Sequence, residues 1–118
     1  MSDEQRSAYL RGKVVAICEA ILREEMRAIS GSRILNKLEI DLLHHGKFGS
    51  FERDEDFLPF VAIDSETDGL PVDFERHNWS AEALQRKDQE IIEAEQWAKE
   101  IAFPACKKLI ARFRIVTD

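Results

Sequence analysis

Two long segments of the chain repeat apolar residues at steps of three and four, and this spacing constrains the fold more than any other feature. The first runs from Asp3 to about Ile29, and the second opens at Ser80 and runs to about Phe113. Residues at this spacing share one face of an α-helix, because the helix has 3.6 residues per turn. The pattern therefore predicts two long amphipathic helices, capped at their starts by Ser2 or Asp3 and by Ser80.

Shorter helices are expected between the two long ones. The Ser30-Gly31-Ser32 sequence predicts a break, with Gly31 as a left-handed C-cap and Ser32 as the N-cap of a helix that ends near His45. A further short helix is predicted from about Asp54 to Ile63, with Pro59 in its first turn. No segment alternates convincingly enough to predict a strand. We expect one all-α domain over residues 1–118, a small antiparallel bundle of two long helices, one or two short ones and a long acidic connection.

The last predicted helix carries two further features. Pro104 is expected to kink it, because proline removes a backbone hydrogen bond. Its central alanines would allow a second helix to approach closely, which leaves self-association as one hypothesis. Basic residues gather near its end, where they complement the helix dipole: Lys107, Lys108, Arg112 and Arg114.

The composition is that of a folded domain. The 118 residues are 44% hydrophobic and 34% charged, which suffices for one hydrophobic core. Cys18 and Cys106 lie within apolar helical patterns, so we interpret them as buried, reduced thiols. No apolar run is long enough to cross a bilayer, and the first residues do not resemble a secretory signal. These features favour a cytoplasmic protein.

The negative charge is concentrated between Glu52 and Glu75. This acidic segment holds nine Asp or Glu residues and one basic residue, Arg53, so it carries −8, whereas the whole chain carries −6. Such a field repels nucleic acid and anionic membranes and attracts basic proteins or cations. We therefore expect a non-enzymatic protein-binding domain with a cationic protein partner, by analogy with bacterial immunity proteins and antitoxins. The candidate contact residues are Asp54, Glu55, Asp56, Phe57, Asp64, Glu66, Asp68, Asp73 and Glu75.

Aromatic residues are interleaved with these acids and allow two interpretations. The rings can be buried against the bundle, or some can remain exposed as anchors for a cationic partner. The residues concerned are Phe48, Phe51, Phe57, Phe60, Phe74 and Trp79.

The alternative function is calcium binding. Asp64, Glu66, Asp68 and Glu75 occupy positions one, three, five and twelve of an EF-hand-like loop, with Gly69 at position six. A simple polar turn at Asp68-Gly69, with glycine at positive φ, explains the same residues. No phosphate-binding loop, nucleophile elbow or other catalytic arrangement is present in the sequence, so no enzyme activity is expected.

One resemblance covers roughly Val14 to Phe113. A long helix, a Ser-Gly-Ser break, a short helix, the motif Phe60-x3-Asp64-x2-Thr67-x2-Leu70-Pro71 and a final alanine-rich helix follow one another. This order resembles an uncharacterised bacterial family of helical domains of unknown function. The resemblance implies a helical fold and no particular activity.

Overall fold

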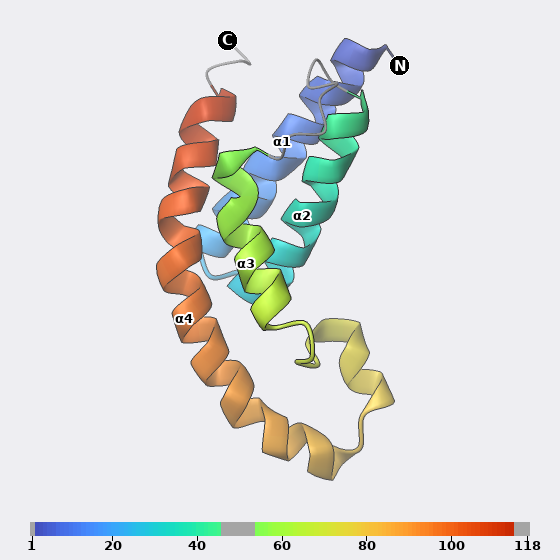
Figure 1. The fold of residues 1–118 in the computed structure, drawn as a ribbon, viewed down its shortest axis with the longest axis vertical. Helices are drawn as coiled ribbons and strands as arrows, with labels where there is room; N and C mark the ends of the chain where they lie inside the picture. Colours follow the sequence, from blue (N-terminus) through green and yellow to red (C-terminus); the bar gives the residue numbers. More distant parts are fainter. Residues whose placement is uncertain (1, 46–53, 115–118) are drawn as a thin grey trace.

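The computed structural model describes residues 2–45 and 54–114, and the regular structure in these ranges is entirely helical. The elements are α1 (Asp3–Leu22), α2 (Ala28–His45), the 3-10 helix η1 (Glu55–Phe57), α3 (Leu58–Glu66), the 3-10 helix η2 (Asp73–Asn78) and α4 (Ala81–Arg114). The long helices α1 and α4 pack antiparallel, and the shorter α2 and α3 pack against them (Figure 1). The prediction of an all-α antiparallel bundle is confirmed.

Two serines begin the long helices as the sequence predicts. The Gln5 amide donates to Ser2 Oγ at 3.2 Å, and the Ser2 amide donates to Gln5 Oε1 at 2.9 Å, which forms a reciprocal capping box at the start of α1. The Ala83 amide donates to Ser80 Oγ at 3.1 Å before α4. These local interactions satisfy N–H groups that have no partner within the helix.

The break between the first two helices lies earlier than predicted. α1 ends at Leu22, and Glu24 takes the left-handed conformation at φ 58°. Gly31 lies inside α2 instead of ending α1, and a Cβ built on it would lie 2.4 Å from Cδ1 of Ile21. Ser32 is not an N-cap either, because its hydroxyl donates to the Ala28 carbonyl within α2 at 2.7 Å. Gly31 therefore serves close packing, not a change of chain direction.

The start of α2 is capped by a side chain from α4. Glu95 Oε2 accepts a hydrogen bond from the Ala28 amide at 2.7 Å, and Oε1 accepts one from the Ile29 amide at 3.1 Å. A carboxylate at this position also interacts favourably with the positive end of the helix dipole. The N-terminus of α2 is thus fixed by a tertiary contact, with no capping side chain of its own.

The hydrophobic core lies where α1, α2, α3 and the C-terminal part of α4 meet. Its largest fully buried side chains include Phe57, Phe60, Leu35, Ile63 and Leu109. We call this region, with η1 and α4 residues 91–114, the body. Residues 73–90, which comprise η2 and the first part of α4, extend beyond the end of the body (Figure 1). We call this extension the arm, and it gives the molecule dimensions of 48 × 25 × 23 Å.

α4 continues as one helix through Pro104, so the proline does not interrupt it. The helix also curves along its length (Figure 1). Within the described ranges, no helix is long and apolar enough to span a membrane. Cys18 and Cys106 are both buried and unbridged, as the sequence predicts.

Candidate protein-binding surface

Asp54 and Asp56 of the acidic segment are neutralised within the molecule by α4. Arg112 Nη1 lies 2.6 Å from Asp54 Oδ2 and 2.9 Å from Asp56 Oδ2, and Lys108 Nζ lies 3.3 Å from Asp56 Oδ1. Partial burial opposes the charge of Arg112, but the hydrogen bonds and negative charges of the two aspartates outweigh it and raise the pKa of Arg112. The basic end of α4 therefore binds the acidic segment itself. Glu52 and Arg53, at the start of that segment, lie outside the described residues.

Phe57 belongs to the core instead of the surface. Its side chain is 1% exposed, and its ring lies 6.4 Å from Phe60 and 6.2 Å from Phe113, measured between centroids. As a correction to the expectation from sequence, the side chain is not available to a partner. Phe60 is buried as well, whereas Phe74 is 86% exposed and Trp79 is 36% exposed. Some of the aromatic residues are therefore buried in the core and others are exposed at the surface. Phe48 and Phe51 lie outside the described residues.

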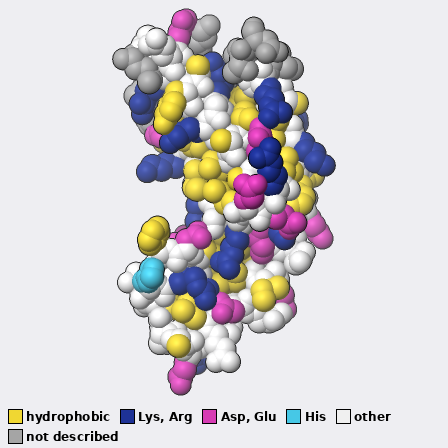
Figure 2. Space-filling model, turned by 180° about the vertical axis from the view of Figure 1, so that it is seen from behind, with side chains coloured by type: hydrophobic (Ala, Val, Ile, Leu, Met, Phe, Trp, Pro, Cys, Tyr) yellow, Lys and Arg dark blue, Asp and Glu magenta, His cyan; other side chains and the backbone are white. Residues whose placement is uncertain are grey.

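The charge distribution on one face of the molecule agrees with this internal pairing. Seen from behind, acidic and basic side chains lie beside one another over the body and do not gather into one acidic face (Figure 2). A segment that carries −8 in sequence therefore presents less negative charge to a partner than its composition implies.

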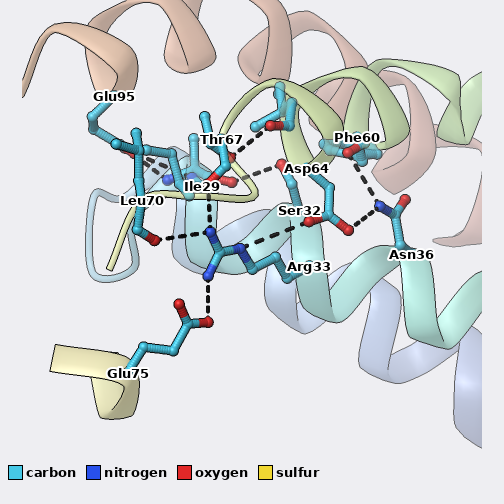
Figure 3. Close-up of polar contacts among 12 residues, drawn as sticks. Ile29, Ser32, Arg33, Asn36, Phe60, Asp64, Thr67, Leu70, Glu75 and Glu95 are labelled. Carbon is cyan, nitrogen blue, oxygen red and sulfur yellow. Dashed lines mark hydrogen bonds and ion pairs between the residues drawn. The ribbon is translucent and has the colours of Figure 1, made fainter. Parts of the chain in front are cut away.

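Arg33 of α2 binds the second part of the acidic segment (Figure 3). Its Nη1 lies 2.8 Å from Glu75 Oε1 and its Nε lies 3.7 Å from Asp64 Oδ1. Its Nη2 donates to the carbonyls of Thr67 and Leu70 at 2.7 and 3.2 Å. A guanidinium has five N–H donors in a planar fork, so one side chain can hold several acceptors at once. Arg33 therefore fixes the chain that leaves α3 and ties Glu75 of the arm to the body.

The geometry differs from the predicted calcium loop. Asp64 and Glu66 lie within helix α3 and not in a loop, and Asp64 and Glu75 share the Arg33 guanidinium. No glycine in residues 2–45 and 54–114 has a positive φ, so Gly69 lacks the conformation expected of it. In the same ranges, no three His, Cys, Asp or Glu side chains gather as a metal site. A cation in this place would have to displace an arginine that already carries the neutralising charge.

Four predicted contact residues remain exposed and form no ion pair with the described part of the chain: Glu55, Glu66, Asp68 and Asp73. Of these, Glu66 lies at the end of α3 and lines an open groove of about 310 Å³ between α3 and α4. We call this the acidic groove. Its lining residues are Glu66, Thr67, Glu90, Glu93, Ala94 and Trp97.

The acidic groove combines negative charge with an accessible aromatic ring. Lys87 Nζ lies 3.1 Å from Glu90 Oε2, and Gln89 Nε2 donates to Glu93 Oε1 at 3.4 Å. Both contacts are exposed, and an exposed ion pair contributes only about 0–1 kcal/mol, so a partner can replace it. Trp97 is 38% exposed beside these carboxylates. Lysine and arginine side chains suit this arrangement, because they form ion pairs with carboxylates and bind the faces of indole rings.

The sequence does not indicate the other two acids of this groove or its tryptophan as contact residues. Glu90, Glu93 and Trp97 lie on one face of α4, at spacings of three and four, which is the helical pattern of a continuous stripe. Acidic residues on a long amphipathic helix are usually solvated, so the stripe alone does not indicate a site. Only the packing of α3 beside α4 brings Glu66 to it.

No protein-family model matches this chain, and no match was found to it among the curated proteins or the solved structures.

Proposed function

We propose that this protein is a non-enzymatic binding domain that holds a cationic protein partner at the acidic groove. One observation carries the proposal: three exposed carboxylates and a partly exposed Trp97 line one groove, and no arginine of the described residues lines it. This combination refines the expectation from the acidic segment, because only Glu66 of that segment contributes.

Charge and ring have separate roles in the proposed binding. Exposed carboxylates steer a basic surface toward the groove and raise the association rate, an effect that salt screens. The indole of Trp97 contributes contact area and a cation–π interaction, which lower the dissociation rate. Lysine or arginine on the partner would be inserted between Trp97 and the carboxylates. A basic toxin bound by an immunity-type inhibitor is one partner of this chemistry.

The proposal can be tested with octa-arginine as the probe, and octaglutamate as the negative control, in low salt. Binding is followed by fluorescence of Trp97 in a Trp79→Phe background. Neutralising the groove with E66Q, E90Q and E93Q should weaken octa-arginine binding by at least about tenfold, the loss of roughly 1.4 kcal/mol.

The matched control removes three charges from other exposed positions with E4Q, E25Q and E55Q. Both triple variants have the same net charge, so a difference between them reports the groove and not the charge of the molecule. Equal weakening in the two variants, or no binding by the unmodified groove, would refute the proposal. Binding that is unchanged between low and high salt would also contradict it.

A further inference from the structure

The antiparallel packing of α1 on α4 brings the two cysteines of the chain together. Cys18 of α1 and Cys106 of α4 are both fully buried, and neighbouring residues of the two helices, Glu19 and Leu22 of α1 and Lys107 and Ile110 of α4, line one groove where α1 packs on α4. α4 is lined here by small buried residues, Ala98, Ala102 and Ala105, which allow the helices to approach closely. The thiols therefore face each other across the α1–α4 interface, although they lie far apart in sequence.

Buried thiols on two helices that pack against each other can form a disulfide with little backbone movement when their side chains face one another. A disulfide requires side chains that point toward one another from backbones about 4.4–6.8 Å apart at Cα. The hydrogen bond with Cys106, followed by burial, raises the pKa of the Cys18 thiol. In the closed bundle the Cys18 thiol is consequently protonated and unreactive, because the thiolate is the nucleophile. Cys106 is buried as well, so packing shields both thiols from an oxidant. Oxidation therefore requires a transient separation of α1 from α4 that admits the oxidant.

We propose that Cys18 and Cys106 form an oxidation site at which a small disulfide, such as oxidised glutathione, creates an internal disulfide that ties α1 to α4. One thiolate attacks a glutathione sulfur, forms a mixed disulfide and expels the first glutathione thiolate. The second protein thiolate then attacks the protein sulfur of the mixed disulfide and expels the second glutathione thiolate. The two protons lost by the cysteines end on the two reduced glutathione molecules. This proposal is independent of the acidic groove.

The bridge would change the stability of the body more than its structure. It closes a long loop in the unfolded chain, so the unfolded state loses conformational freedom while the native packing is retained. Because the reduced thiols are protected by packing, the oxidised form accumulates only when the bundle opens, as it does near its unfolding transition or while it folds.

The test incubates the full chain with oxidised glutathione a few degrees below its thermal midpoint, then returns it to the cold. We expect a monomer that has lost two free thiols and the mass of two hydrogen atoms. Its thermal midpoint should rise by roughly 10 °C and return to the original value with dithiothreitol. C18A and C106A serve as matched controls, since each retains one cysteine and should show no such rise.

Three results would overturn the proposal. Two glutathione adducts on one chain would show that the thiols cannot reach each other. Disulfide-linked dimers would show that they react between molecules. A bridged monomer with an unchanged or lower midpoint would show that the bond does not fit the native packing. Refolding in a glutathione redox buffer provides a second route, and a fully reduced product there would also contradict the proposal.

Discussion

The two parts of α4 have different surroundings, although they form one helix. Residues 91–113 bury seven side chains against the body, whereas no residue of the arm, 73–90, is buried. Two ion pairs stabilise the arm instead. Arg33 of the body binds Glu75 of the arm, and Arg76 binds Asp88 within the arm, at 2.8 Å each. The radius of gyration is 15.4 Å, compared with about 13.5 Å for a compact domain of this length. An apolar pattern thus predicts that a segment is helical without fixing how much of it is packed, and local stability follows packing.

Replacing one phenylalanine in each region gives the largest expected contrast. Phe60 is fully buried, and Phe60→Ala should lower the free energy of unfolding by about 3–5 kcal/mol, because it leaves a cavity in the body. Phe74 in the arm is 86% exposed, and Phe74→Ala should change the free energy of unfolding by less than about 0.5 kcal/mol. Urea unfolding measures both. Similar losses in the two variants would show that the arm is packed as tightly as the body.

Arg33 is the joint between the two regions, so its removal should affect both. Arg33→Gln removes hydrogen bonds to two carbonyls and to the Glu75 carboxylate, together with the ion pair to Asp64, and we expect a loss of about 2 kcal/mol. Amide hydrogen exchange in residues 73–78 should accelerate as well. Arg23→Gln is the control, since Arg23 forms a surface ion pair with its side chain 66% exposed. Unchanged exchange in the arm of Arg33→Gln would show that other contacts hold it.

Two helical glycines test packing within the body. Alanine at Gly12 meets no atom within 4 Å and should stabilise the protein by about 0.5–1 kcal/mol through helix propensity. Alanine at Gly31 would collide with Ile21, which is itself buried, and should destabilise it by about 1 kcal/mol after the same propensity gain. Thermal unfolding shows whether each variant is more or less stable than the unmodified protein. Stabilisation by Gly31→Ala would contradict the tight contact between α1 and α2.

The smallest effect concerns pH in the arm. The hydrogen bond from Arg76 lowers the pKa of Asp88 below its ordinary value. A lowered carboxyl pKa contributes stability above the unfolded-state pKa of about 3.9, and this contribution is lost as the pH falls through the lower folded-state value. NMR titration should therefore show helical shifts near residue 88 fading below about pH 4, before the body changes. In Arg76→Gln the Asp88 pKa should rise toward its ordinary value, and an unaltered titration would show that Arg76 does not lower this pKa.

Sequence information was sufficient where structure is decided locally. Ser2 and Ser80 begin helices through amides three residues away, and the apolar stripe of α4 continues to its end. The turn between α1 and α2 could not be located in this way, because residues 23–27 are Arg-Glu-Glu-Met-Arg, which favour helix. Gly31 indicated a break, but a glycine is also required where a neighbouring side chain approaches closely, and the sequence does not distinguish the two causes.

The candidate site was less predictable for a related reason. The count of acids in the acidic segment is a property of sequence, but their partners Arg33, Lys108 and Arg112 are brought to them by folding. Charge that is paired inside the molecule does not attract a partner as unpaired charge does. Glu66 was identified, whereas Glu90 and Glu93 become part of a groove only through the packing of α3 beside α4.

The cap that Glu95 places on α2 has a consequence for the order in which the bundle assembles. The amides of Ala28 and Ile29 precede their carboxylate by 67 and 66 positions, so they remain hydrated until α4 docks. A newly synthesised chain can form α1 and much of α2 early, but the first turn of α2 must wait for α4, which is synthesised after them. The cap therefore joins distant parts of the chain, and contacts between residues far apart in sequence slow folding.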